Sequence, residues 1–345
     1  MKALRYFGPG DIHCEGMDDP RLEADTDIIV KMNLCAICGS DLHIYHGHGF
    51  SEDTGYCVGH EAVGEVVETG RAVRRLRAGD RVMLPAATGC GACRQCLSGM
   101  VGKCENNMAG CYGLSAALQG CQAEAIRVPA GDFNAVPIPD GLSDEQALML
   151  TDAMATAWFG ARRAQIAPGG TVAVIGLGPI GLMAVESAFV MGASRVFAID
   201  PVAARRALAA ERGAEVFHPS DALEEIREAT CGRKADSVIE AVGGDGTIDL
   251  ALRLAGRGGI ISAIGVAQTK RYAFPLERAF GQGLTFAIGT CSVPFELPAL
   301  IPLVQSGRLK PETTISHRLS LSDGAEAYRL CDIKAEGALK VVMSA

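Results

Sequence analysis

The middle of the chain has the most regular pattern of hydrophobic and polar positions. Short apolar runs typical of buried strands occupy residues 171–175, 195–199, 215–217, 237–240, 259–264 and 284–289. Ala-rich stretches with helical character lie between them, at residues 179–191, 203–212, 221–230 and 247–254. Strands that alternate with helices need right-handed crossovers, which produce a parallel sheet with helices on both faces. The pattern therefore predicts a doubly wound α/β domain over residues 154–290.

The segments on either side of this region have a different pattern. Before it, short Gly-interrupted runs at residues 28–32, 63–68 and 81–84 indicate a β-rich domain. After it, residues 291–345 lose the alternation and end in an apolar run at 339–343. We therefore assign residues 1–153 and 291–345 to one domain, and we expect a helix near residues 151–163 to join it to the other.

Length and composition narrow the possible classes of protein. The 345 residues exceed what one hydrophobic core usually supports, and 48% apolar with 21% charged residues excludes a disordered or fibrous chain. The net charge of −8, without a concentration of basic residues, argues against a nucleic-acid partner. The chain has neither a signal core nor an apolar stretch of membrane-spanning length, so we expect a cytoplasmic protein with no membrane partner.

The cysteines are numerous and unevenly distributed. Ten of the thirteen lie between Cys14 and Cys121, within the predicted β-rich domain. A long chain with an odd number of cysteines and no export signal favours reduced thiols over disulfides. The first third of the chain therefore looks metal-binding.

A glycine-rich turn follows the first strand of the α/β domain. The strand at 171–175 runs directly into Gly176, Leu177, Gly178, Pro179, Ile180 and Gly181 and then into a helical stretch. In a dinucleotide-binding turn the first Gly makes the turn, the second lets the backbone approach a pyrophosphate, and the third lets helix and strand pack closely. The helix N-terminus then offers free N–H groups to the phosphates, and Pro179 suits a position whose N–H would be unpaired. A ligand-free Gly-rich turn is the competing interpretation.

An acidic residue at the end of the next strand indicates which dinucleotide is bound. Asp200 follows Gly181 by 19 residues, where a carboxylate can accept hydrogen bonds from the ribose hydroxyls of the adenosine half. It would also repel a 2′-phosphate, so we predict NAD rather than NADP. Arg205 could partly offset that repulsion.

Four cysteines in the first domain have the spacing of a structural metal site. The pattern C-x2-C-x2-C-x7-C comprises Cys90, Cys93, Cys96 and Cys104. Four thiolates around Zn²⁺ leave no position for water, which makes such a site structural. An iron–sulfur cluster and four unliganded buried cysteines are the alternatives.

A second, looser group has the composition of a catalytic zinc site, which needs about three protein ligands and one open position. Cys38 and His60 are two candidate ligands, and Asp152 is the third donor that the chain offers downstream. Asp41 is a candidate partner for the other ring nitrogen of His60, and Glu61 is next to the metal. A redox pair of Cys35 and Cys38 is the alternative, and we expect His46 and His48 to be loop or surface residues.

These residues resemble the zinc-dependent medium-chain alcohol and polyol dehydrogenases over essentially the whole chain. The matching motifs are Cys-Gly-Ser-Asp-Leu-His at 38–43, Gly-His-Glu at 59–61, Gly-Asp-Arg-Val at 79–82, the four-Cys lobe and the glycine-rich turn with Asp200. The resemblance implies a GroES-like catalytic domain, a Rossmann domain and an active site in the cleft between them.

The resemblance also implies roles for particular residues. Cys38, His60 and Asp152 would bind a catalytic zinc with Glu61 beside them, the four-Cys lobe would bind a second zinc, and Ser40 and His43 would form a proton relay. The residues implied to contact the cofactor outside the glycine-rich turn are Thr156, Val242, Gly265 and Val266 at the nicotinamide and Lys340 at the pyrophosphate. An aspartate as the third ligand departs from the mammalian liver-type pattern and is similar to some bacterial members.

The implied activity is reversible hydride transfer between a small alcohol, secondary in preference, and NAD, giving a ketone or aldehyde. A zinc-free quinone or enoyl reductase on the same fold and a non-catalytic dinucleotide sensor are the alternatives, and neither needs Cys38, His60 and Asp152 together. For the substrate pocket we expect Ser40, Tyr45, Leu84, Tyr112, Trp158, Thr290 and Cys291. By the same resemblance we expect a homodimer or homotetramer, with residues 284–289 as an exposed edge strand.

Overall fold

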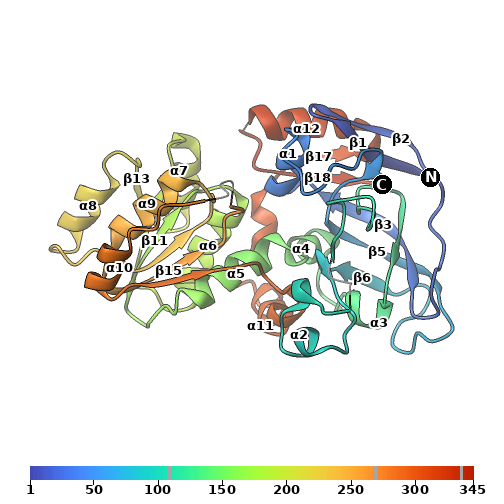
Figure 1. Cartoon of the computed structure of the whole chain (residues 1–345), viewed down its shortest axis with the longest axis horizontal. Coiled ribbons are helices and arrows are strands. Elements are labelled where there is room, and N and C mark those ends of the chain that lie inside the picture. Colours follow the sequence, from blue (N-terminus) through green and yellow to red (C-terminus); the bar gives the residue numbers. More distant parts are fainter. Residues whose placement is uncertain (107–109, 268–270, 335–336) are drawn as a thin grey trace. The chain divides into compact units, whose positions relative to one another are not determined.

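The computed structural model describes residues 1–106, 110–267, 271–334 and 337–345 and divides into two compact units (Figure 1). Unit 1 comprises Met1–Ala155 and Cys291–Ala345, and unit 2 comprises Thr156–Thr290. These limits lie within two residues of the predicted boundaries at 153 and 154, and they agree at 290 and 291.

Unit 1 is built around a mixed sheet whose strands come from both ends of the chain. Its order is β10-β6-β5-β3-β18-β17, with β9 paired to β3. The strands are β3 (Ile28–Ala36), β5 (Glu61–Thr69), β6 (Arg81–Leu84), β9 (Ala125–Val128), β10 (Val136–Pro137), β17 (Ile315–Ser320) and β18 (Lys340–Ser344). Smaller sheets contain β1 (Lys2–Gly8), β2 (Asp11–Gly16) and β4 (Tyr56–Cys57), and β7 (Ala87–Thr88) with β8 (Gly110–Cys111).

Strand β18 joins the C-terminal segment to this sheet. It pairs antiparallel with β3, where Val342 is opposite Ala36, and parallel with β17. The apolar side chains of β18 are buried in one core cluster with those of β3 and β5, which explains why this run is as hydrophobic as an interior strand. The assignment of the last segment to the first domain agrees with this pairing.

Short helices connect the strands of unit 1. They are α1 (Gly39–Tyr45), α2 (Arg94–Leu97), α3 (Gly131–Asn134), α4 (Asp144–Leu150), α11 (Val293–Gln305) and α12 (Gly324–Ile333), with 3-10 turns at Val101–Lys103, Pro311–Thr314 and Leu321–Asp323. Helix α5 (Ala153–Arg163) contains the boundary between the units and matches the predicted joining helix. Sequence reasoning did not identify α11, because Pro298 and Pro302 lie inside it.

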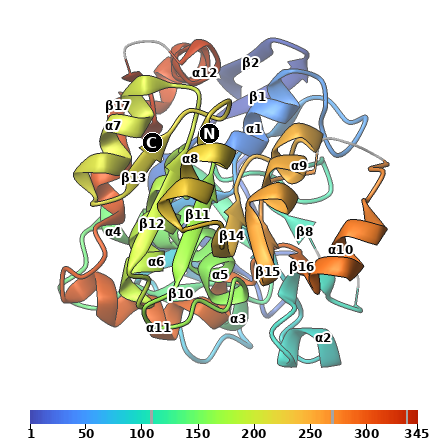
Figure 2. The ribbon, with the colours of Figure 1, turned by 90° about the vertical axis from the view of Figure 1, so that its left-hand side faces the viewer.

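Unit 2 has the predicted doubly wound architecture. Its six strands are parallel in the order β13-β12-β11-β14-β15-β16, with helices on either side (Figure 2). The strands are β11 (Thr171–Ile175), β12 (Arg195–Ile199), β13 (Glu215–Phe217), β14 (Ala235–Glu240), β15 (Ala255–Ala263) and β16 (Thr285–Ile288). The expected edge position of residues 284–289 agrees with the place of β16.

The helices of unit 2 are α6 (Pro179–Val190), α7 (Ala203–Glu211), α8 (Ala222–Ala229), α9 (Asp245–Leu254) and α10 (Leu276–Gln282). The first four lie within two residues of their predicted ends, because each follows a strand, and the apolar side chains of α8 and α9 join the core cluster of the sheet. No helix in the described part of the chain is long and apolar enough to cross a membrane.

Candidate active site

Three side chains of unit 1 that can bind a metal meet in one place. Cys38 immediately precedes α1, His60 immediately precedes β5, and Asp152 lies between α4 and α5. One donor atom from each lies within 4.8 Å of the other two. Cys38 Sγ is 3.5 Å from Asp152 Oδ2, and His60 Nε2 is 3.7 Å from the same oxygen. Separations of this size suit donors that surround one ion.

The electrostatics of the three donors fit a divalent cation. Burial raises the pKa of the Cys38 thiol, and the Asp152 carboxylate raises it further. Burial lowers the pKa of His60, but Cys111, Asp41 and Cys38 raise it by more, so the net pKa lies well above the usual imidazole value. A buried group of acidic donors of this kind gains stability when a metal cation neutralises it. Thiolate, imidazole and carboxylate are all zinc ligands.

A buried hydrogen-bonded network lies against the Nδ1 side of the His60 ring. Asp41 Oδ1 is 3.3 Å from His60 Nδ1, the ring nitrogen that faces away from the other donors. Asp41 Oδ2 accepts hydrogen bonds from the Cys38 backbone N–H at 2.9 Å and from Gln122 Nε2 at 3.3 Å. The Tyr328 hydroxyl in turn donates a hydrogen bond to Gln122 Oε1 at 2.9 Å. This network orients the imidazole so that Nε2 faces the metal donors.

A hydroxyl and a second imidazole lie on α1 beside the donors. Ser40 Oγ is 3.2 Å from His60 Nε2, so the hydroxyl borders the group of metal donors. His43 lies one turn further along the helix and is half-buried. Burial lowers the pKa of His43, and the nearby His48 and His46 lower it further. The neutral ring is therefore the dominant form at neutral pH, and it can accept a proton.

Glu61 and Lys340 form a buried ion pair next to the donors. The Lys340 ammonium contacts Glu61 Oε2 and donates a second hydrogen bond to the Ile37 carbonyl at 3.1 Å. Burial raises the pKa of Glu61, and the charge of Lys340 opposes this rise only in part. Burial lowers the pKa of Lys340, but the Glu61 carboxylate raises it by more, so the net pKa of the amine is raised. The two side chains are 0% and 2% exposed. The Lys340 amine is therefore paired with Glu61 and Ile37 in this structure, and its contact with a pyrophosphate stays a prediction.

Sequence reasoning missed two residues around the site. Cys111, in β8, lies close enough to His60 to raise its pKa, and Gln122 connects Asp41 to the Ala36 carbonyl at 3.1 Å. Neither belongs to a motif, and only folding brings them near Cys38. Two of the expected pocket residues lie elsewhere: Leu84 and Tyr112 are 0% exposed within the core of unit 1, because both pack into its main hydrophobic cluster.

The four cysteines of the predicted structural site surround a common point. The sulfur atoms of Cys90, Cys93, Cys96 and Cys104 all lie within 4.8 Å of one another. Cys90 and Cys96, like Cys93 and Cys104, are 4.0 Å apart, too far for a disulfide. Four sulfurs at a Zn–S distance of about 2.3 Å would be separated by about 3.8 Å, so the arrangement fits a zinc ion.

Backbone amides favour thiolates in this lobe. The N–H groups of Ala92 and Cys93 donate to Cys90 Sγ at 3.4 and 3.3 Å, and they lower the pKa of Cys90 to about 6. Amides of Cys96 and Glu105 likewise lower the pKa of Cys93. Thiolates are the forms that ligate zinc. The lobe is tied to α11 by a buried hydrogen bond from the Val101 N–H to Ser292 Oγ at 2.9 Å.

The glycine-rich turn of unit 2 has distinct requirements at its three glycines. Gly176 has φ +88°, and a Cβ at Gly181 would lie 1.7 Å from the Gly176 carbonyl oxygen. At Gly178 a Cβ would meet nothing within 4 Å, so the space above this residue is open. Pro179 occupies the first turn of α6, and Ile180 follows it. An open glycine backbone at a helix N-terminus is a cradle for a pyrophosphate.

Asp200 lies at the end of β12 next to this turn. Its Oδ2 accepts the Leu177 N–H at 2.8 Å, and its Oδ1 accepts the Val202 N–H at 2.8 Å. Arg205 Nη1 is 3.9 Å from Asp200 Oδ2, a loose contact between partly covered groups. The acid and the glycine-rich turn are therefore joined directly by the Leu177 N–H.

Two further loops lie at the same edge of the sheet, after β14 and β15. Val242 and Val266 are 39% and 40% exposed, and a Cβ on Gly265 would lie 2.4 Å from the Val242 carbonyl carbon. Glu240 is fully buried, and its Oε1 accepts the N–H groups of Val242 and Gly243, both at 2.9 Å. These contacts hold Val242, Gly265 and Val266 together. Thr156 is partly exposed on α5, at the start of unit 2.

Comparisons with known proteins match both units. The family model for the alcohol dehydrogenase GroES-like domain matches residues 24–140, and that for the zinc-binding dehydrogenase matches residues 179–306. A protein of Mycobacterium tuberculosis described as a probable zinc-binding alcohol dehydrogenase is 41% identical over 329 residues, covering 95% of this chain and 84% of that protein.

Solved structures are similar over the full length of the chain. Alcohol dehydrogenase TADH from Thermus sp. ATN1 has a TM-score of 0.94 at 39% identity, covering 100% of this chain and 99% of that one. A candidate zinc-binding dehydrogenase from Sinorhizobium meliloti 1021 bound to NADP has a TM-score of 0.87 at 31% identity, covering 100% and 99%.

Proposed function

The chain belongs to the zinc-binding alcohol dehydrogenase family, and we propose that it catalyses reversible hydride transfer between an alcohol, with a preference for secondary alcohols, and NAD. The observation that carries the proposal is the meeting of Cys38, His60 and Asp152 with the Ser40 hydroxyl against them. A glycine-rich turn and an acidic strand end in unit 2 supply the features of a dinucleotide site.

Two zinc ions per chain are part of this proposal. When bound beside the substrate, zinc acts as a Lewis acid that makes an alcohol hydroxyl easier to deprotonate. Cys38, His60 and Asp152 would hold this ion, and three protein ligands leave one position open. The four cysteines of the lobe would enclose the second ion completely. A zinc-free reductase or a dinucleotide sensor would need no such three-donor group.

The chain's own residues move the proton. Ser40, whose Oγ is 3.2 Å from His60 Nε2, takes the proton of the substrate hydroxyl and passes its own hydroxyl proton on along the relay that ends at His43. His43, on the same helix and partly exposed, delivers the proton to solvent. The lowered pKa of His43 keeps the ring available as an acceptor at neutral pH.

The preference for NAD over NADP rests on Asp200. Its buried carboxylate next to the glycine-rich turn would repel a 2′-phosphate, and Arg205 at 3.9 Å offsets this charge only weakly. Arg206 Nη1 donates to the Asp200 and Pro201 carbonyls, so it is also occupied.

We further propose that copies of the chain pair through β16 in a homodimer or homotetramer. This edge strand ends at Ile288, which is 55% exposed, and Phe280 on the preceding helix α10 is 87% exposed. An unpaired edge with apolar side chains favours association with a second edge. Light scattering is expected to give at least twice the chain mass, and a monomer at all concentrations would refute the pairing.

The experiment that tests the proposed function is a steady-state assay with primary, secondary, cyclic and polyol substrates, each with NAD⁺ and NADP⁺. We expect the highest kcat/KM with a secondary alcohol and NAD⁺. The variant Asp200→Ala should reduce the preference for NAD⁺, whereas the exposed-site control Asp18→Ala should not. Absence of turnover with every alcohol in a zinc-loaded protein would overturn the proposal.

A further inference from the structure

A basic cleft lies at the edge of the unit 2 sheet opposite the glycine-rich turn. Lys234 directly precedes β14, and Arg257 lies near the start of β15. The glycine-rich turn instead follows the carboxyl end of β11, which runs parallel to β14. The cleft has a volume of about 370 Å³, and one acid, Glu224, lines it together with five cations: Arg227, Arg233, Lys234, Arg257 and Arg278.

The positive charge of this basic cleft is largely unneutralised. Among the described residues the one nearby ion pair joins Arg227 and Glu224 at 3.9 Å. Its side chains are 61% and 77% exposed, so it contributes little to neutralising the cleft. Arg257 and Arg278 are exposed, and within the described residues neither has an ion-pair or hydrogen-bond partner. Five cations facing one acid leave a surplus of about four positive charges around one hollow.

Two of the five cations bind carbonyl groups at the C-terminal ends of helices, which explains the positions of those two alone. Lys234 Nζ donates to the Arg253 carbonyl at 2.8 Å at the end of α9, and Arg233 Nε donates to the Thr230 carbonyl at 3.3 Å at the end of α8. Cations at helix C-termini are stabilised by the helix dipole. Arg257 and Arg278 have no such carbonyl partner, so capping does not account for their presence.

The cations lie close enough to repel one another. Partial burial lowers the pKa of Lys234, and Arg278 and Arg227 lower it further against the opposing effect of Glu224. Like charges held around a hollow reduce the stability of the fold unless an anion occupies the space between them.

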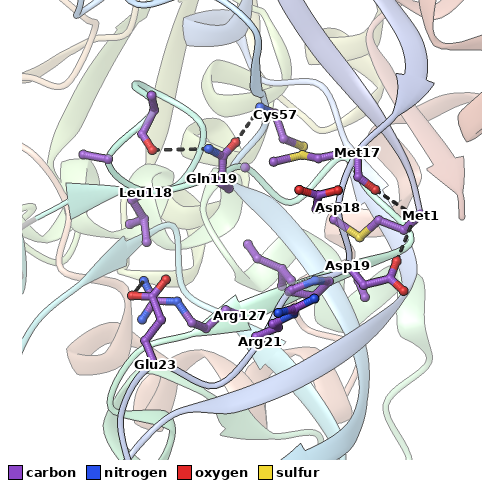
Figure 3. Close-up of a pocket in the computed structure, with 16 residues that line it drawn as sticks. Met1, Met17, Asp18, Asp19, Arg21, Glu23, Cys57, Leu118, Gln119 and Arg127 are labelled. Carbon is purple, nitrogen blue, oxygen red and sulfur yellow. Dashed lines mark hydrogen bonds and ion pairs between the residues drawn. The ribbon is translucent and has the colours of Figure 1, made fainter.

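A second charged pocket, on unit 1, shows the contrast (Figure 3). It has a similar volume of about 340 Å³ and also carries charges of both signs. There the amine of Met1 pairs with Asp19 at 2.8 Å, and Arg127 pairs with Glu23 at 3.1 Å and Asp27 at 3.0 Å. Its cations are matched by carboxylates of the chain, so it has no comparable surplus charge for an anion.

We infer that the basic cleft binds a small anion with two or more phosphate groups, at a site separate from the dinucleotide turn. Guanidinium groups match phosphate oxygens in pairs, and several of them can serve adjacent phosphates. The cleft has the volume of a small-molecule pocket. Its lining contains few apolar side chains, Leu223 and Ala255, so we expect it to recognise the phosphate groups of a ligand rather than a large aromatic group.

The test is calorimetric titration of inorganic pyrophosphate into the full-length protein, zinc-loaded and saturated with NAD⁺ so that the dinucleotide site is filled. We expect one pyrophosphate per chain, with an affinity that falls as salt concentration rises. The double variant Arg257→Gln, Arg278→Gln should weaken binding at least tenfold. The double variant Arg308→Gln, Lys310→Gln removes the same charge from exposed positions of unit 1 and should bind as the wild type does.

The inference would be overturned by no binding by the wild type, by equal weakening in both double variants, or by binding that disappears when NAD⁺ is present. Binding of RNA in the absence of pyrophosphate binding would also overturn it, because the site would then recognise a polymer. Unchanged circular dichroism and an unchanged KM for NAD⁺ in the Arg257→Gln, Arg278→Gln variant would show that the loss of binding is local.

Discussion

Ser40 is the hydroxyl that borders the metal donors, 3.2 Å from His60 Nε2. We predict that Ser40→Ala lowers kcat by about 10²- to 10⁴-fold, the usual contribution of a positioned proton acceptor, while zinc stays bound. Steady-state kinetics and metal analysis of the same sample test this. Ser306→Ala, at an exposed position, is the control and should keep wild-type kcat. Loss of zinc in Ser40→Ala would assign the hydroxyl a structural role instead.

The buried pair of Lys340 and Glu61 makes a second prediction possible. Lys340→Met leaves the Glu61 carboxylate without its partner, which should cost about 3–5 kcal/mol of unfolding free energy. Glu61→Gln should cost a similar amount, because it leaves the ammonium unpaired. The double variant removes both charges and should lose less than the sum of the two. Urea denaturation of the zinc-loaded proteins measures all three values, and strict additivity would contradict a direct coupling.

In the glycine-rich turn before α6, one glycine is needed for packing and another leaves room for the cofactor. A Cβ at Gly181 would collide with the Gly176 carbonyl oxygen, whereas a Cβ at Gly178 would project into open space. We therefore predict that Gly181→Ala destabilises unit 2, and that Gly178→Ala leaves its stability nearly unchanged but raises the KM for NAD⁺ at least tenfold. Thermal unfolding and steady-state kinetics distinguish these results. A normal KM in Gly178→Ala would mean that the pyrophosphate does not approach this residue.

Helix α4 is connected to strand β17 by a paired contact, in which Arg318 Nε and Nη2 donate to Glu145 at 2.6 and 2.9 Å. Arg318 lowers the pKa of Glu145, so the contact stabilises the fold above the ordinary pKa of a glutamate. This stabilisation is lost as pH falls through the lowered folded-state pKa. Because the Arg318 and Glu145 side chains are 58% and 31% exposed, we predict that Glu145→Gln costs less than about 1 kcal/mol at pH 7 and less at pH 3 than at pH 7. Urea denaturation at both pH values, with Glu52→Gln as the control, tests this, and an effect that grows toward low pH would contradict it.

Local patterns in the chain predicted most elements of unit 2 and the four-cysteine group, whereas Cys38, His60 and Asp152 lie up to 114 positions apart and were grouped through the family resemblance. The glycine-rich turn and the spacing of Cys90, Cys93, Cys96 and Cys104 are local, and their geometry depends on a few neighbouring residues. The alternation of strands and helices likewise depends on short segments that bury one face. Such features can be recognised before the fold is known.

Contacts between distant segments could not be predicted in this way. Lys340 reaches Glu61 across 279 positions of sequence, and no motif connects them. Gln122 reaches Asp41 across 81 positions and is held there by Tyr328 of α12. Tyr112 is buried although it was expected in the substrate pocket. Burial of this kind is decided by tertiary packing, which periodicity along the chain does not contain.

The most direct measurement of the central claim is the zinc content per chain, determined by mass spectrometry of the metal in the wild type and two variants. We predict two zinc ions per wild-type chain, one in Cys38→Ser with alcohol oxidation abolished, and one in Cys93→Ser with the Cys38 site still occupied. A zinc-replete wild-type chain that binds one ion, and that loses it entirely in Cys93→Ser, would contradict the account.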